Sequence, residues 1–141
     1  MAGQKKQDIY CWKMESDGLT IYTASSSKGA VRTGLILGQG PDCRTYFTNR
    51  FPADRIHEDE NKNLPLIKAL KGVLAGRPVL KDLEPDIHCT PFQRMVWAKI
   101  AQIPFGQTRT YGEIALITGR PGGARAVGQA MTRNPLPLIF P

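Results

Sequence analysis

Five side chains in this sequence have the chemistry to act as nucleophiles or metal ligands: Cys11, Cys43, Cys89, His57 and His88. The cysteines are odd in number and far apart, and no C-x-x-C occurs, so no disulfide framework is predicted. A zinc site from the three cysteines and His88 is conceivable on composition, but its spacing matches no known ligand pattern. The adjacent His88 and Cys89 also make an awkward ligand pair. We therefore expect buried or incidental cysteines, no metal and no cofactor.

A second chemical feature is one arginine among small side chains. Arg125 lies in a predicted helix that follows Arg120-Pro121, runs to about Arg133, and is otherwise rich in Gly122, Gly123, Ala124, Ala126, Gly128 and Ala130. A helix that reads bases in the major groove carries several Asn, Gln or Arg side chains, and this helix lacks that set. One protruding arginine on a bare helix suits minor-groove contact or replacement of an extruded base. The alternative is a tight helix–helix packing face with Arg125 in solvent.

Positive charge is concentrated in the last 55 residues. The net charge of the sequence is +7. Residues 87–141 contain six Lys or Arg and one acid, Glu113, and so carry +5, which leaves +2 for residues 1–86. A basic, acid-poor segment is typical of a protein that binds a polyanion such as nucleic acid. The alternative is a surplus that serves solubility alone.

Length and composition suit a globular protein. The 141 residues are enough for one domain or two small ones, and 41% are hydrophobic while 22% are charged. These values exclude a disordered or collagen-like chain. Uncharged runs are too short for a transmembrane helix, and no apolar segment follows the N-terminal residues, so we expect no signal peptide and a cytoplasmic location.

The first half of the sequence is predicted to form a small sheet followed by a helix. Short apolar or β-branched runs separated by turn residues indicate an antiparallel meander with strands at Ile9–Trp12, Leu19–Ala24, Ala30–Leu37 and Arg44–Phe47. Leu64–Ala75 has apolar residues at helical spacing, and Gly76 is a stop signal. Residues 77–88 have weak periodicity and are predicted to be a linker, with domains at 1–86 and 87–141.

The second half is predicted to be helical. Thr90-Pro91-Phe92-Gln93 has the capping-box spacing and opens a helix that ends at Pro104-Phe105-Gly106. Thr110 repeats that spacing with Glu113 and opens a short helix, which ends at Gly119. The following helix, which contains Arg125, ends at Asn134-Pro135 because proline disfavours helix in the residue before it. Two short helices joined by a tight turn make a helix-turn-helix. The expected fold class is therefore α+β.

Several motifs follow one another in the last third of the sequence. They are Thr90-Pro91-Phe92-Gln93 with Val96-Trp97, Ile103-Pro104-Phe105-Gly106-Gln107-Thr108, Thr110-Tyr111-Gly112-Glu113-Ile114-Ala115, Ala124-Arg125-Ala126-Val127-Gly128 and Asn134-Pro135-Leu136-Pro137. In this order they strongly resemble the C-terminal domain of the O6-alkylguanine-DNA alkyltransferases, also called methylated-DNA–protein-cysteine methyltransferases. Residues 1–85 resemble that family only in architecture, as a small sheet and helix like its ribonuclease-H-like N-terminal domain.

The resemblance implies DNA repair by direct reversal. Family members bind duplex DNA in the minor groove, flip an O6-alkylguanine and transfer its alkyl group once to their own cysteine. By position, Arg125 would enter the base stack and Tyr111 would press on the phosphate and help to rotate the nucleotide. Asn134 would be a hinge that braces the turn to the active site. The other positions implied to contact DNA or allow its close approach are Gln93, Thr110, Arg120, Ala124 and Gly128. The implied partner is double-stranded DNA that contains O6-alkylguanine, bound by a monomer away from any membrane.

Simpler roles remain open for three of these residues. Tyr111 is alternatively a residue of the first helical turn packed on the core. Gln93 is alternatively only the partner of Thr90 in the capping box. Asn134 is alternatively an ordinary helix stop, a role that does not exclude the hinge.

The sequence departs from the family at its end. The family's Pro-Cys-His-Arg motif follows the Asn-Pro segment, whereas this sequence reads Leu138-Ile139-Phe140-Pro141, so the acceptor cysteine would follow Pro141. The transfer needs a thiolate activated by a neighbouring histidine, and none of the three cysteines lies in that context. We therefore expect the 141-residue chain as given to bind DNA without accepting an alkyl group.

Three explanations for this ending are open. The sequence is part of a longer alkyltransferase, it comes from a truncated gene that leaves a DNA-binding relic, or it is an alkyltransferase-like protein that binds lesions without a cysteine. The last fits poorly, because those relatives keep the chain beyond this point. A helix-turn-helix transcription regulator is disfavoured by the bare second helix.

Overall fold

The computed structural model describes residues 6–77, 83–104 and 106–137, and these ranges form two compact units. One unit contains the chain up to Lys68 and the segment that ends at Asp86. The other contains the segment that begins at Ala69 and the chain from Ile87 onward. The first holds the sheet and the second holds the last three helices, so the α+β class is confirmed.

The sheet is built on two hairpins. Its strands β1 (Asp8–Ser16), β2 (Leu19–Ser26) and β3 (Gly29–Leu37) pair antiparallel in sequence order, which confirms the first three predicted strands. Asp17 and Gly18 connect β1 to β2 with φ of 47° and 78°. Positive φ at both central residues is the geometry of a type I′ turn, whose twist matches that of the flanking strands.

The predicted fourth strand at Arg44–Phe47 is wrong. These residues belong to a helix, α1 (Cys43–Thr48). Cys43 and Phe47 are four residues apart and both buried, whereas Thr45 between them is exposed. A strand would place all three side chains on one face, so only the helical period buries the apolar pair and leaves Thr45 in water.

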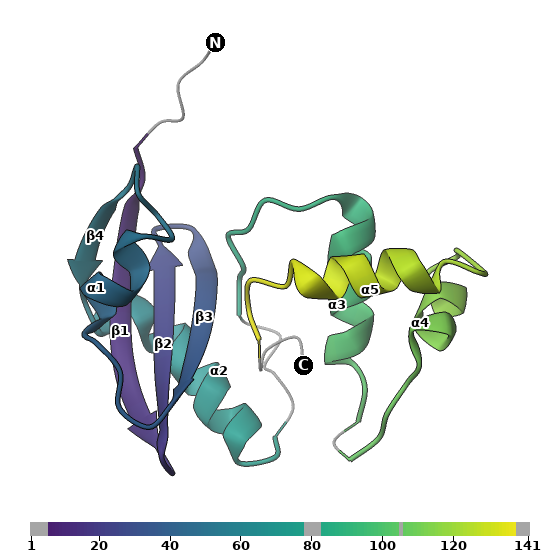
Figure 1. Ribbon diagram of the computed structural model, residues 1–141, viewed down its shortest axis with the longest axis horizontal. Helices are drawn as coiled ribbons and strands as arrows, with labels where there is room; N and C mark the ends of the chain where they lie inside the picture. The colour runs from purple at the N-terminus through teal and green to yellow at the C-terminus, as the bar shows by residue number, and fades with distance from the viewer. Residues whose placement is uncertain (1–5, 78–82, 105, 138–141) are drawn as a thin grey trace. The chain divides into compact units, whose positions relative to one another are not determined.

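The actual fourth strand, β4 (Arg55–Glu58), pairs parallel to β1, so the strand order is β3-β2-β1-β4 and the sheet is mixed (Figure 1). Its four residues include one apolar side chain, Ile56, which gives no alternation that a sequence pattern could detect. The strand forms because backbone groups at the free edge of β1 need partners.

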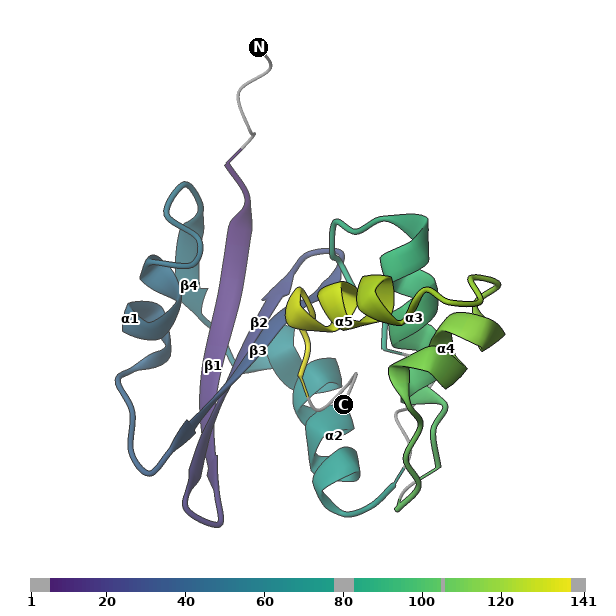
Figure 2. The ribbon, with the colours of Figure 1, turned by 45° about the vertical axis from the view of Figure 1, so that its right-hand side comes forward.

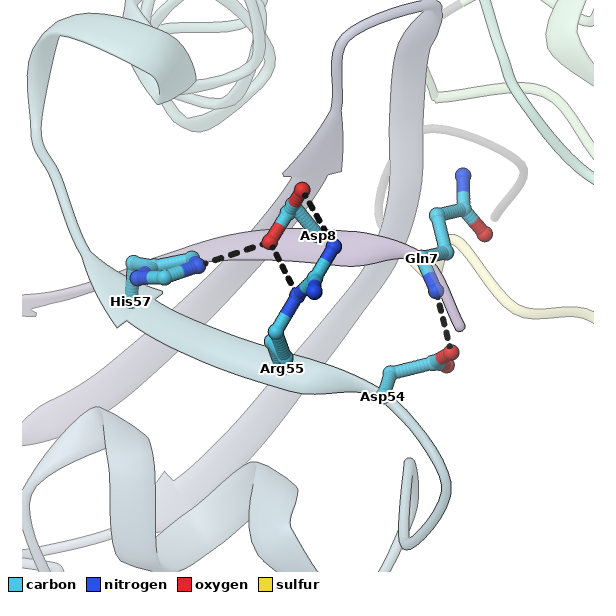
Figure 3. Close-up of polar contacts among 5 residues, drawn as sticks. All are labelled: Gln7, Asp8, Asp54, Arg55 and His57. Atoms are coloured by element: carbon cyan, nitrogen blue, oxygen red, sulfur yellow. Dashed lines mark hydrogen bonds and ion pairs between the residues drawn. The ribbon is translucent and has the colours of Figure 1, made fainter. Parts of the chain in front are cut away.

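Polar side chains join β4 to β1 at this edge of the sheet (Figure 3). Arg55 donates from Nε and an NH2 nitrogen to the two carboxylate oxygens of Asp8, at 2.9 and 3.2 Å, and His57 Nε2 lies 2.9 Å from Asp8 Oδ1. Just before the two strands, the backbone N–H of Gln7 donates to the carboxylate of Asp54 at 3.0 Å. The ring of His57 stacks on that of Tyr10, with centroids 5.5 Å apart.

A buried asparagine connects the sheet to the next helix. Asn63 ends the short 3₁₀ helix η1 (Asn61–Asn63), directly before α2 (Leu64–Leu74). Its amide nitrogen donates to the carbonyls of Tyr10 and Asp59, and its oxygen accepts from the hydroxyl of Ser25. α2 confirms the helix predicted at 64–75. In the predicted linker, residues 77 and 83–88 contain no helix or strand, and 78–82 lie outside the described residues.

The second unit contains α3 (Pro91–Ala101), α4 (Tyr111–Ile117) and α5 (Ala124–Thr132), as predicted (Figure 2). Its core is formed by Val96, Trp97, Ile100, Ile114, Ala115, Val127 and Ala130. The Trp97 indole N–H donates to the carbonyl of Ala130 at 3.0 Å, which ties α3 to α5. No helix among the described residues is long and apolar enough to cross a bilayer.

The Asp8 contacts predict a pH-dependent contribution to stability. Hydrogen bonds from Arg55 and then from His57 lower the pKa of the Asp8 carboxyl below its ordinary 3.8. A carboxyl whose pKa is lower when folded stabilises the fold above its unfolded pKa and loses that contribution as the pH falls through the folded value. We expect Asp8→Asn to lower Tm at pH 7, only slightly because the groups are exposed, and the difference from wild type to shrink as the pH falls below 3.8.

Thermal unfolding of the wild type and of Asp8→Asn between pH 2 and pH 7 measures this difference in Tm. Glu15→Gln is the matched control, because Glu15 is exposed on the same strand and its substitution removes the same charge. Equal Tm values for the two variants at every pH would contradict the assigned role of Asp8.

Candidate nucleic-acid interface

The turn between α4 and α5 brings these two helices together. Gly119 and Gly122 in this turn have φ of 79° and 78°, and the backbone N–H of Arg120 donates to the carbonyl of Ala115 at 2.8 Å. A Cβ at Gly123 would lie 2.9 Å from the carbonyl oxygen of Arg120. Glycine at these positions therefore permits a connection that larger residues would strain.

α5 combines a packed side and an exposed side. Val127 and Ala130 are buried in the core of the unit, whereas Arg125 and Gln129 are exposed. Helix packing thus accounts for Ala130, one of the small residues in the motif. It does not account for Arg125, which lies on the opposite side of the helix from the core.

The ring of Tyr111 packs against α5 at Gly128, about one turn from Arg125. A Cβ at Gly128 would lie 3.3 Å from Cε2 of the Tyr111 ring, so the ring of α4 lies directly against the glycine of α5. Gly128 is three residues after Arg125 and on the same side of α5. Tyr111 is 51% exposed, so one edge of its ring is packed while the rest faces solvent. Tyr111 is thus packed against Gly128 on one edge and accessible to solvent on the rest of its ring.

Arg120 lies over the first turn of α3. Its guanidinium carbon is 4.2 Å from the centroid of the Phe92 ring, a cation–π distance. Arg120 remains exposed, so this stacking orients the guanidinium without covering it. Gln93, the neighbour of Phe92, is half-buried in the same turn.

The two predicted capping threonines both accept a backbone hydrogen bond. Thr90 Oγ1 accepts from the N–H of Gln93, and the Gln93 side-chain oxygen accepts from the N–H of Thr90, which confirms a reciprocal capping box at α3. Thr110 Oγ1 accepts from the N–H of Glu113 at 3.1 Å at the start of α4. The capping role of Gln93 uses its oxygen and leaves its NH2 group available to a ligand.

Asn134 shapes the turn that follows α5. Its side-chain oxygen accepts from the N–H of Leu136 at 2.9 Å, and its own N–H donates to the carbonyl of Met131. Leu136 is fully buried, so this turn is anchored at both ends. Ala124 begins α5 and is half-buried. The acceptor cysteine is predicted to follow Pro141 and so is not among the 141 residues of the sequence, and residues 138–141 lie outside the described ranges.

The charge of the helical unit faces solvent. From residue 87 onward its five arginines are all exposed: Arg94, Arg109, Arg120, Arg125 and Arg133. Glu113 is the one acid from residue 87 onward, and the described part of this unit contains no ion pair. The cations are therefore not neutralised locally and are available to a polyanion.

The described residues contain no group of three or more His, Cys, Asp or Glu that could hold a metal ion. A hollow of about 180 Å³ lies beside α4, with Lys99, Ile103, Arg109 and Ile117 among its lining residues. It is smaller than pockets that typically hold cofactors, which start near 300 Å³. Cys11 and Cys43 are buried in the sheet unit, and Cys89 is half-buried against the helical core.

Sequence reasoning missed two contacts on this surface. The contact of Tyr111 with Gly128 and that of Arg120 with Phe92 both join residues far apart in the sequence. A glycine inside a predicted helix was a usable signal for the first, because it marks a close approach by another group. No local signal identified the second.

A family model, curated proteins and solved structures all identify the same family. A family model described as the DNA binding domain of 6-O-methylguanine DNA methyltransferase matches residues 91–141. The inducible methylated-DNA–protein-cysteine methyltransferase of Bacillus subtilis is 32% identical over 121 residues, which cover 86% of this chain and 68% of that protein. The methylated-DNA–protein-cysteine methyltransferase of Mycolicibacterium paratuberculosis is 44% identical over 75 residues, which cover 53% of this chain and 46% of that protein.

The structural comparison extends over nearly the whole chain. A crystal structure of Mycobacterium tuberculosis OGT in complex with DNA aligns with a TM-score of 0.69 and 30% identity, and covers 94% of this chain and 75% of that one. The matches to the first curated relatives span about half of their length.

Proposed function

Because the chain belongs to the methylated-DNA–protein-cysteine methyltransferase family, we propose that residues 87–141 are the DNA-binding domain of a direct-reversal repair protein. This domain binds duplex DNA through the minor groove, extrudes an O6-alkylguanine and presents it to a cysteine. The observation that carries the proposal is the half-exposed Tyr111 ring packed against Gly128 of α5, the helix on which Arg125 is exposed three residues earlier.

Arg125 replaces the extruded base. Flipping a nucleotide costs a few kcal/mol of stacking and pairing, and a side chain that enters the vacated space offsets part of that cost. Arg125 is the long exposed side chain near the start of α5, where its neighbours Ala124 and Ala126 are short enough to let the helix approach the groove. The guanidinium also offers donors to the orphaned base opposite the lesion.

Tyr111 acts on the nucleotide that rotates. Its phenol is exposed while its ring edge is held against Gly128, so the group has a fixed position from which to press on a phosphate. A larger residue at 128 would displace the ring. The small side chain thus serves both the packing of α4 on α5 and the placement of Tyr111.

Gln93, Thr110 and Arg120 position the domain on the DNA backbone. Gln93 lies in the first turn of α3, and Thr110 is the N-cap of α4. Arg120 stacks on Phe92 in the first turn of α3. Backbone N–H groups at the start of a helix also favour binding of a phosphate. Such contacts orient a protein without reading sequence, which suits repair at any site in a genome.

The chemical step is a displacement at the alkyl carbon. A cysteine thiolate forms the new S–C bond while the C–O6 bond breaks, and the electron pair leaves with guanine. The family resemblance implies that this cysteine would follow Pro141, after the turn that contains Asn134. The buried thiols of Cys11 and Cys43 belong to the sheet unit and take no part.

The inserted arginine predicts a selective loss. We expect Arg125→Ala to reduce the preference for a duplex with one O6-methylguanine over the undamaged duplex by about tenfold or more, because flipping loses its partner. Affinity for undamaged DNA should fall only a fewfold, through loss of one charge. Fluorescence anisotropy with both duplexes at fixed salt measures the two effects.

Arg133→Ala is the matched control, because Arg133 is exposed near the other end of α5 and carries the same charge. It should weaken binding to both duplexes equally. Lesion preference that survived intact in Arg125→Ala would refute the inserted-arginine role.

Gln93 offers a test that separates capping from DNA contact. Glutamate serves as well as glutamine in a capping box, so Gln93→Glu should keep the stability of the fold while its negative charge weakens DNA binding several-fold. Gln93→Ala should instead lose about 1 kcal/mol of stability in urea unfolding. Unchanged DNA affinity in Gln93→Glu would show that Gln93 is a cap residue alone.

A further inference from the structure

We propose that Cys11 and Cys43 are a redox pair that peroxide converts to a disulfide within the sheet unit. The two residues are 32 positions apart in the sequence, Cys11 in β1 and Cys43 at the start of α1. Their sulfur atoms lie 2.7 Å apart. This inference is independent of the proposed DNA-binding function, whose residues lie in the other unit.

The fold holds the two sulfurs ready to bond. A disulfide has an S–S length of about 2.05 Å, so the pair needs to close by only a fraction of an ångström. Both side chains are buried, with 0% and 1% exposure, in a cluster that also contains Ile9, Tyr22 and Phe47. α1 packs against β1, so the elements that carry the two cysteines are already neighbours within one unit.

The contact makes the two thiols chemically unequal. Cys11 donates its S–H to the sulfur of Cys43, which lowers the pKa of Cys43 and raises that of Cys11. Burial and the nearby carboxylate of Glu58 oppose the effect at Cys43. The thiolate is the nucleophilic form of cysteine, so Cys43 is the residue that meets the oxidant first.

The reaction balances with hydrogen peroxide as the oxidant. The Cys43 thiolate attacks one peroxide oxygen, the O–O bond breaks, and Cys43 becomes a sulfenic acid while hydroxide leaves and is protonated to water. Cys11 then attacks the Cys43 sulfur, the S–O bond breaks, and a second water leaves. Two thiols and one peroxide thus give one disulfide and two waters.

Access for the oxidant depends on local opening of α1. This helix has six residues, and Arg44, Thr45 and Thr48 on its outer side are exposed. A short surface helix separates from a sheet at a lower free energy than the whole domain unfolds. Peroxide is little larger than water, so a brief opening admits it.

Cys89 supplies an internal comparison. It is a free thiol in the helical unit, half-buried against Trp97 and its neighbours. Cys11 and Cys43 are buried within the other unit and in contact with each other, so peroxide should leave Cys89 outside the cross-link.

The test counts free thiols before and after oxidation. The reduced 141-residue chain is treated with hydrogen peroxide, unfolded in urea with N-ethylmaleimide, and weighed by intact mass spectrometry. Untreated protein should take three maleimides, one for each cysteine, and peroxide-treated protein should take one. A digest should contain one peptide pair joined through Cys11 and Cys43, and dithiothreitol should restore all three labels.

A matched variant removes the third thiol. Cys89→Ser should take two maleimides before peroxide and none after it, whereas Cys43→Ser should form no intramolecular disulfide. Because labelling follows unfolding, the wild type and Cys89→Ser decide the question even where Cys43→Ser fails to fold. Three labels after peroxide, oxygen added to Cys43 without a joined peptide, or a cross-link through Cys89 would each overturn the proposal.

Discussion

The hydrogen bond from the Trp97 indole to the Ala130 carbonyl holds the helical unit together around α5. Four of the nine residues of α5 are glycine or alanine, so the helix has little side-chain area to bury and its position depends on what its neighbours supply. Trp97 contributes a large ring and a donor, and Val127 and Ala130 of α5 are buried in the core of the unit. With α5 fixed in this way, the side that carries Arg125 and Gly128 is free of core packing.

The exposed face follows from this constraint. Gly128 receives the ring of Tyr111, and Arg120 stacks on Phe92. Both contacts orient a polar group while leaving it in solvent, and no carboxylate among the described residues of the unit pairs with the arginines. The helical unit therefore presents preplaced donors and positive charge, as expected for recognition of a phosphate backbone.

Local signals predicted the helices well because caps and glycine stops act within a few residues. Thr90, Thr110 and Gly76 each marked a true helix end. The strand β4 and the helix α1 were missed or misassigned because both depend on packing and pairing with β1, which no short window contains. The exposed position of Arg125 followed from the helical period. The contact of Cys11 with Cys43 could not be predicted from the sequence, because a separation of 32 residues carries no geometric information.

The salt dependence of duplex binding tests the central claim most directly. If the exposed arginines of the helical unit bind phosphates, the logarithm of the affinity should fall linearly with the logarithm of the salt concentration, with a slope of about −3 to −5. Two undamaged duplexes of unrelated sequence should give the same line. Binding that did not respond to salt, or a strong preference for one sequence, would contradict a backbone-directed DNA-binding domain.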